Sequence, residues 1–143
     1  MTGWWSHAAV SHSSRRLGGI DMNRQLALTD AVKGIRAQGG PAMTRIEPIS
    51  CLYFGNGVKC ALGHLFDPAQ YSENFEGNDL ESLPSIADAI NSRYGEITSD
   101  DIEFLDALQC AHDTVFREAD FIRLFEENIA KLAHIYGLEV PAP

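Results

Sequence analysis

Two stretches in the C-terminal third repeat apolar residues at spacings of three and four, and this pattern limits the fold more than any other feature. Residues 98–115 carry four such residues on one helical face: Phe104, Leu108, Ala111 and Val115. Residues 118–136 carry six: Phe121, Leu124, Phe125, Ile129, Leu132 and Tyr136. Because a helix turns once in about 3.6 residues, these spacings predict two amphipathic helices whose apolar faces must be buried.

Two earlier helices are predicted by the same spacing and by the residues at their ends. The first begins at Met22 and stops at Gly39, with an apolar face made of Leu28, Ala31, Val32 and Ile35. The second opens at Pro84 and closes at Gly95, since proline suits the first turn of a helix and glycine the residue after the last turn. The segment Thr98–Asp101 resembles a capping box, which predicts the start of the third helix there.

The segment between the first two helices holds the clearest β signal. Leu52–Phe54 and Val58–Cys60 are β-prone and flank Gly55-Asn56-Gly57, and Asn-Gly is the strongest short hairpin signal. A two-stranded hairpin is not stable alone in water, so it is expected to pack on the helices. Residues 61–66 are expected to turn helical, and residues 72–81 to form an acidic loop. We therefore expect a mainly α fold, with four to five helices packed on a small β-hairpin (α+β).

The chain's 143 residues suit a single domain, which we expect to span residues 22–143. Residues 1–21 show no sustained period, and Gly18-Gly19 stands just before Met22. We interpret this arm as disordered or non-native sequence ahead of a natural start at Met22. The sequence has neither a secretory signal pattern nor an apolar run of about 20 residues, and its three cysteines are an odd number. These features predict a cytoplasmic protein.

The negative charge is concentrated in the middle of the chain. The whole chain has a formal net charge of −9. Between Lys59 and Arg117 there are twelve acidic residues and one basic residue, Arg93, which gives that stretch a net charge of −11. Such a surface repels nucleic-acid phosphates and attracts basic protein surfaces. The simpler alternative is that the charge serves only solubility, and the sequence leaves both interpretations open.

The cysteines and histidines supply enough ligand types for a zinc site. The candidate ligands are Cys51, Cys60 and His64, and the last two would share one face if they lie on a helix. The spacing is nevertheless unlike that of a zinc knuckle. Cys110 and His112 are two residues apart on a predicted helix and point about 200° apart. Buried structural thiols are the alternative interpretation.

A thiol hydrolase is a second chemical alternative, with Cys60 as nucleophile and His112 as base. Asp113 is not expected to orient His112, because neighbouring helical residues diverge by about 100°. The pair His112-Asp113 also occurs in metal-dependent phosphohydrolases, for which His64 and Asp120 would have to complete the set at an unsuitable spacing. The simpler interpretation is that His112 helps to cap carbonyls at the end of its helix, with Asp113 in solvent or capping the next turn.

The segments Cys51–Leu65 and Leu108–Asp113 together resemble a group of short phage and bacterial proteins to which no activity is assigned. The resemblance covers about residues 48–138. Within it, these residues match the pattern: Cys51, Tyr53, Gly57, Cys60, Ala61, Gly63, Leu65, His112 and Asp113. It implies a shape and a phage-like context, in which small acidic proteins often disarm host defences. Such proteins resemble anti-CRISPR-type inhibitors that occupy a basic nucleic-acid channel.

The sequence thus favours a binding protein over an enzyme: an acidic protein that inhibits or regulates a basic, nucleic-acid-handling host protein by nucleic-acid mimicry. The candidate contact residues are Glu73, Glu76, Asp79, Glu81, Asp100, Asp101 and Glu103. Asp100 and Asp101 could instead do no more than favour the dipole at a helix start. No cofactor, direct nucleic-acid contact or membrane contact is expected, and an oligomer stays open. The alternative is a small cysteine–histidine hydrolase or zinc-binding protein using Cys60, His64 and His112.

Overall fold

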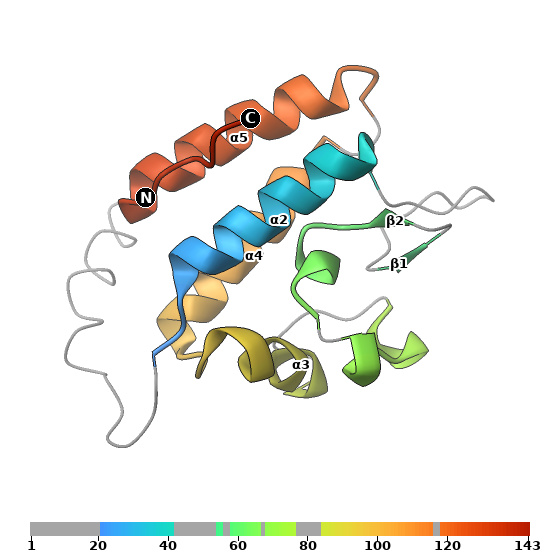
Figure 1. Cartoon of the computed structure of the whole chain (residues 1–143), viewed down its shortest axis with the longest axis vertical. Coiled ribbons are helices and arrows are strands. Elements are labelled where there is room, and N and C mark those ends of the chain that lie inside the picture. Colours follow the sequence, from blue (N-terminus) through green and yellow to red (C-terminus); the bar gives the residue numbers. More distant parts are fainter. Residues whose placement is uncertain (1–20, 42–53, 56–57, 67, 77–83, 116–117) are drawn as a thin grey trace.

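The computed structural model describes residues 21–41, 54–55, 58–66, 68–76, 84–115 and 118–143. This part of the chain holds four α-helices: α2 (Arg24–Gln38), α3 (Pro84–Tyr94), α4 (Ser99–Asp113) and α5 (Phe121–Tyr136). It also holds two short strands, β1 (Phe54–Gly55) and β2 (Val58–Lys59), and three 3₁₀ turns, η2 (Leu62–His64), η3 (Pro68–Gln70) and η4 (Glu73–Phe75). In Figure 1 the three longest helices, α2, α4 and α5, run alongside one another, and α3 lies near one end of them. The mainly α class predicted from the sequence is confirmed.

Most of the predicted helix ends are confirmed, although α2 begins at Arg24 and not at Met22, and α5 begins at Phe121 and not at residue 118. The Asn23 side chain accepts a hydrogen bond from the Leu26 N–H at 2.9 Å and thereby begins α2. Gly39 ends α2 with φ 75°, a left-handed conformation that glycine adopts without a steric penalty. The capping box of Thr98 and Asp101 is complete in both directions at the start of α4. The residues at the chain's turns therefore determine where these helices start and stop.

The hydrophobic core lies between α2, α4 and α5. The fully buried side chains at its centre include Leu28, Ile35, Phe104, Leu108, Phe125 and Ile129, all at the spacings noted in the sequence. Burying one such side chain contributes about 1.5–3 kcal/mol. The segment before α3 adds a cluster of three aromatic rings, in which Phe75 makes edge contacts with Phe66 and Tyr71 at centroid distances of 5.1 and 5.6 Å.

The prediction that residues 61–66 are helical is correct for a single turn only and wrong for the rest of the segment. Only Leu62–His64 is helical, as the 3₁₀ turn η2. Its backbone finds partners outside the segment: the Leu62 N–H donates to Gln109 Oε1 on α4 at 2.9 Å. Because this N–H already has an acceptor on a neighbouring helix, it does not require the carbonyl acceptor that a longer helix would supply. The predicted loop at residues 72–81 contains the turn η4, and residues 77–81 lie outside the described part.

Strands β1 and β2 pair antiparallel, with Phe54 opposite Lys59 and Gly55 opposite Val58. The turn at residues 56–57 lies outside the described residues, so the predicted hairpin as a packed unit stays a prediction. The end of α2 holds β2 in place, because the Gln38 amide donates to the Lys59 carbonyl at 2.6 Å and accepts from the Lys59 N–H at 3.0 Å.

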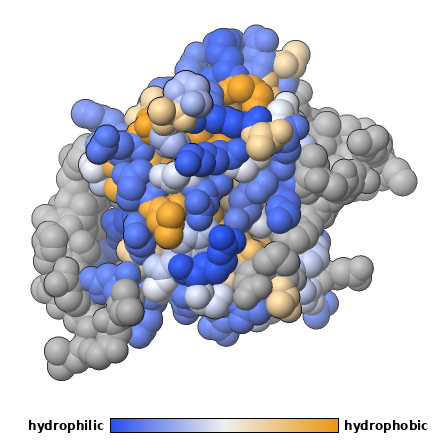
Figure 2. All heavy atoms as spheres, viewed as in Figure 1, coloured by the Kyte–Doolittle hydropathy of each residue, from blue (hydrophilic) through white to orange (hydrophobic). Residues whose placement is uncertain are grey.

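The C-terminal tail folds back against α2. The guanidinium of Arg36 makes two hydrogen bonds to the Glu126 carboxylate on α5, at 2.6 and 2.9 Å, and another to the carbonyl of Pro141 at 2.9 Å. The face drawn in Figure 2 mixes hydrophobic groups with hydrophilic side chains. None of the helices in the described residues has the length and apolar character to cross a membrane. Residues 1–20, most of the predicted arm, lie outside the description.

Candidate protein-binding site and the buried histidine network

Three carboxylates form a line along α4. Asp100, Glu103 and Asp106 follow one another at a spacing of three residues, and each is partly exposed. Residues three apart on a helix lie on the same side. We call these three residues the acidic row. The sequence analysis selected Asp100 and Glu103 but missed Asp106, which the three-residue spacing alone could have indicated.

Asp101 does not belong to this surface, although the sequence made it a contact candidate. It is 5% exposed, and its carboxylate accepts hydrogen bonds from the Thr98 N–H at 2.9 Å and from Arg24 Nε at 2.7 Å. The physical reason is its place on the helix, because Asp101 lies three residues before Phe104 and shares its core-facing side. As the sequence analysis allowed, Asp101 caps α4.

The other four contact candidates lie in and after the turn η4. Glu73 opens that turn. Glu76 is partly exposed, and its carboxylate accepts a hydrogen bond from the Tyr71 hydroxyl, so it has a local structural partner. Asp79 and Glu81 lie outside the described residues. Of the seven contact candidates, Asp100 and Glu103 are therefore the two that the described residues place partly exposed along one helix, and Asp106 extends them.

The acidic row also changes the environment of Tyr136 on α5. Burial raises the pKa of the Tyr136 hydroxyl to about 12, and the negative charges of Glu103, Asp100 and Asp106 act in the same direction. Arg24 opposes them, and its guanidinium carbon lies 5.5 Å from the centre of the Tyr136 ring. The three carboxylates thus act together as a negative field where α4 meets the end of α5.

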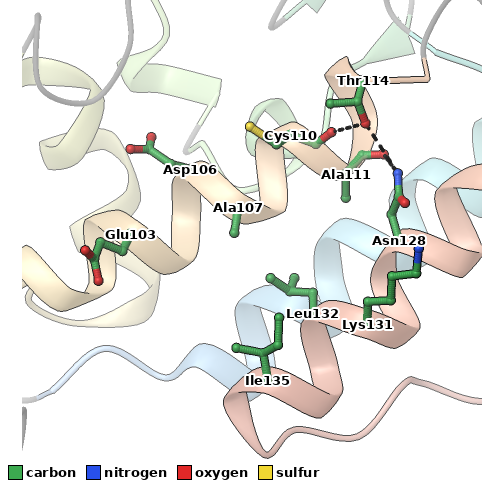
Figure 3. Close-up of a pocket in the computed structure, with 10 residues that line it drawn as sticks. All are labelled: Glu103, Asp106, Ala107, Cys110, Ala111, Thr114, Asn128, Lys131, Leu132 and Ile135. Carbon is green, nitrogen blue, oxygen red and sulfur yellow. Dashed lines mark hydrogen bonds between the residues drawn. The ribbon is translucent and has the colours of Figure 1, made fainter. Parts of the chain in front are cut away.

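Next to Glu103 and Asp106, α4 and α5 border an open groove of about 500 Å³ (Figure 3). From α4 it is lined by Glu103, Asp106, Ala107, Cys110, Ala111 and Thr114. From α5 it is lined by Asn128, Lys131, Leu132 and Ile135. Its middle is apolar, one end carries the two carboxylates of the row, and Lys131 lies toward the other end. The sequence did not predict this groove, because it depends on how two helices pack.

The end of α4 is capped differently from the prediction. His112 is fully buried and does not lie at the exposed carbonyls. The Thr114 hydroxyl donates to the Cys110 carbonyl at 2.8 Å, and the Asn128 amide donates to the Ala111 carbonyl at 3.2 Å. These two side chains satisfy carbonyls that the last turn of a helix leaves without an internal partner.

His112 contacts the neighbouring carboxylate, contrary to the sequence prediction. Its Nδ1 donates to Asp113 Oδ1 at 2.9 Å, and Gln109 Nε2 donates to the same oxygen at 2.9 Å. The angle of about 100° between neighbouring helical residues describes their Cβ directions only. Asp113 is the last residue of α4 and its carboxylate can turn back toward the imidazole. The contact therefore holds a buried histidine in place.

Cys60 lies at the other end of the same network. Its thiol is fully buried and accepts a weak hydrogen bond from the Gly63 N–H at 3.4 Å. Burial raises the pKa of the Cys60 thiol to about 12, and hydrogen bonds from Gly63 and Gln109 only partly oppose that effect. A catalytic thiol needs the opposite environment, one that lowers its pKa and leaves it accessible. The geometry gives the hydrolase hypothesis no support.

His64 is held by α2 and not by a cysteine. Its Nε2 lies 2.9 Å from Gln38 Oε1 and must carry the proton, because an amide oxygen only accepts. The imidazole packs so closely on α2 that a Cβ at Gly34 would overlap the ring. Burial lowers the pKa of His64 to about 4, and the electrostatic effects of Lys59 and His112 act in the same direction.

This arrangement does not support the alternative of a zinc site. Within the described ranges no three side chains of histidine, cysteine, aspartate or glutamate gather closely enough to hold a metal ion. Cys51, the third candidate ligand, lies outside those ranges. Cys110 is exposed and His112 buried, as expected from their different helix faces.

No protein-family model, curated protein or solved structure matches the chain. The resemblance to short phage and bacterial proteins therefore stays a prediction.

Proposed function

We propose that the chain is a binding protein, not an enzyme, and that it docks on a basic protein surface through the acidic row of Asp100, Glu103 and Asp106. The single observation that carries the proposal is the position of these carboxylates. They are partly exposed and follow one another along α4, and two of them, Glu103 and Asp106, line an apolar groove. Charge complementarity of this kind speeds association and selects the partner.

The charge of the surrounding chain supports the same proposal. The stretch between Lys59 and Arg117 has a net charge of −11. A field of one sign draws partners of the opposite sign over roughly the Debye length, about 10 Å at 0.1 M salt. We propose a nucleic-acid-handling host or defence protein as the partner, in the cytoplasm, because such proteins carry dense positive charge for phosphates. The finer proposal is a phage inhibitor of such a protein.

The test is a capture experiment from host lysate with three versions of the full chain. One is the wild type. The second neutralises the row as Asp100→Asn, Glu103→Gln and Asp106→Asn. The third is a matched control that removes the same charge from exposed residues elsewhere, as Glu118→Gln, Glu127→Gln and Glu139→Gln. Captured proteins are identified by mass spectrometry at low and at high salt.

We expect the wild type and the control to retain the same basic proteins at low salt and to release them at high salt. The row variant should retain them about tenfold less, which corresponds to about 1.4 kcal/mol shared among three partly exposed ion pairs. Equal losses from the row variant and the control would mean that only overall charge matters. That result, or capture that does not respond to either variant, would contradict the proposal.

A further inference from the structure

We infer that the groove between α4 and α5 receives an apolar side chain from a basic, amphipathic segment of the partner, while a lysine or arginine of the same segment lies against Glu103 and Asp106. This inference rests on the proposed function and adds the class of partner segment. Apolar contact in the groove would then provide affinity for this segment, and the charges of the acidic row would orient it.

The size and lining of the groove fit an apolar side chain. Its volume of about 500 Å³ lies within the range of sites that hold small organic groups. Leu132 and Ala111 line the groove and are 5% exposed, and the lining residues Ala107 and Ile135 are partly exposed. Removing an apolar side chain from water favours binding in proportion to the apolar surface buried, so a buried anchor of this kind adds affinity that salt does not weaken.

The charges at the two ends of the groove give the occupant a direction. Glu103 and Asp106 stand at one end of the groove, and the ammonium group of Lys131 lies toward the other, near Asn128 (Figure 3). A basic residue of the occupant is therefore favoured near the carboxylates. A carboxylate or a helix C-terminus is favoured near Lys131. An amphipathic helix that binds in a groove in this way is a common mode of peptide recognition.

A second copy of this chain is a poorer occupant. The chain has a formal net charge of −9, so two copies repel each other. A basic segment of a partner would instead be attracted to the carboxylates of Glu103 and Asp106. An acidic small molecule is disfavoured for the same reason, whereas an occupant recognised by apolar contact alone would be mimicked by a neutral leucine peptide.

The probes are two synthetic peptides of equal charge. One combines lysines with leucines at helical spacing, and the other replaces each leucine with alanine. Binding to the full chain is measured by fluorescence anisotropy at low salt. The test variant is Ala107→Gln, which puts a polar side chain into the groove without changing charge. Its matched control is Ala130→Gln at an exposed position of α5 outside the groove.

A second measurement uses Cys110, which is exposed and lines the groove. Its alkylation by a maleimide is followed by mass mapping with and without each peptide. The lysine–leucine peptide should slow the alkylation at least about fivefold, because it covers the groove. The lysine–alanine peptide should slow it much less.

We expect the wild type to bind the lysine–leucine peptide at least about tenfold more tightly than the lysine–alanine peptide. Ala107→Gln should remove most of that preference and Ala130→Gln none of it. If both peptides bind equally and the acidic-row variant weakens both, the groove inference fails while the proposed function stands. If neither peptide binds, the groove inference and the proposed function both fail. A leucine preference that leaves Cys110 unprotected also overturns the inference, and so does protection by a neutral leucine peptide of equal length.

Discussion

Cys60 and Cys110 are the two cysteines of the described chain, and they lie in opposite environments. Cys60 is fully buried between η2 and α4, with the pKa of its thiol raised to about 12. Cys110 is exposed at the groove, although burial of part of its side chain and the charges of Asp113 and Asp106 raise its pKa as well. Both environments disfavour the thiolate, and of the two thiols only that of Cys110 is exposed.

The first prediction concerns these thiols. In the native protein at about pH 8, a small alkylating reagent should modify Cys110 and leave Cys60 unmodified, because a thiolate must form and be reached before it reacts. Cys60 should react only after unfolding in denaturant. Mass mapping of the modified residues checks this, and it separates Cys51 from the other two. Native modification of Cys60 at a rate equal to that of Cys110 would contradict the buried network and would revive the hydrolase hypothesis.

The environments of individual side chains on α4 were only partly predictable from the sequence. Polarity alone grouped Asp100 with Asp101, yet one is partly exposed and the other is 5% exposed. A shift of one position on a helix moves a side chain by about 100°, which is enough to exchange solvent for core. The contact between His112 and Asp113 was missed because it depends on rotamers that no spacing rule contains.

At the scale of elements, the start of α4 depends on Asp101. The second prediction is that Asp101→Ala lowers the free energy of unfolding by about 2 kcal/mol, because Thr98 and Arg24 both lose a charged hydrogen-bond partner. The matched control is Asp100→Ala, which removes the same group from a partly exposed neighbour and should cost about 0.5 kcal/mol or less.

Urea unfolding of both variants measures this difference. Equal costs for the two substitutions would contradict the separation of Asp101 from the acidic row. In that case, Asp101 would again be a candidate contact residue.

The contact between α2 and η2 gives the third prediction. Gly34→Ala should lower the free energy of unfolding by about 1–3 kcal/mol, because the new methyl group would overlap the His64 imidazole. Alanine normally stabilises a helix relative to glycine, so the sign of the effect identifies the contact. Gly40→Ala is the control, since a Cβ there meets nothing within 4 Å.

The double variant Gly34→Ala with His64→Ala provides the decisive comparison, because the overlap disappears when the ring is removed. Its cost should be smaller than the sum of the two single costs by about 1 kcal/mol. Additive costs, measured by urea unfolding, would show that the imidazole does not lie on Gly34.

The elements themselves were the most predictable part of the fold. Helix starts and ends follow from single residues such as Asn23, Gly39 and Thr98, whose conformational preferences act locally. The segment at residues 61–66 was not predictable in the same way. Its single turn η2 is held by side chains of α2 and α4, which are remote in sequence. Local propensity carries no information about such partners.

At the scale of the whole molecule, the candidate site arises where α4 and α5 meet. The sequence located the negative charge, and it placed most of the apolar face of each helix correctly, with Leu124 of α5 as an exception. It could not show that the outer edges of the two helices leave a groove, because that depends on their relative orientation. The central claim joins both features: the acidic row and the groove make one surface for a basic, amphipathic partner.

The measurement that tests this claim most directly is the affinity for the lysine–leucine peptide as salt is raised from about 0.05 M to 1 M, over which screening shortens the Debye length to about 3 Å. For the wild type, we predict a steep loss of affinity that ends on a salt-resistant remainder from the groove. For the row variant, with Asp100, Glu103 and Asp106 neutralised, we predict a shallower loss that reaches the same remainder. An identical salt dependence in the two proteins would contradict the claim.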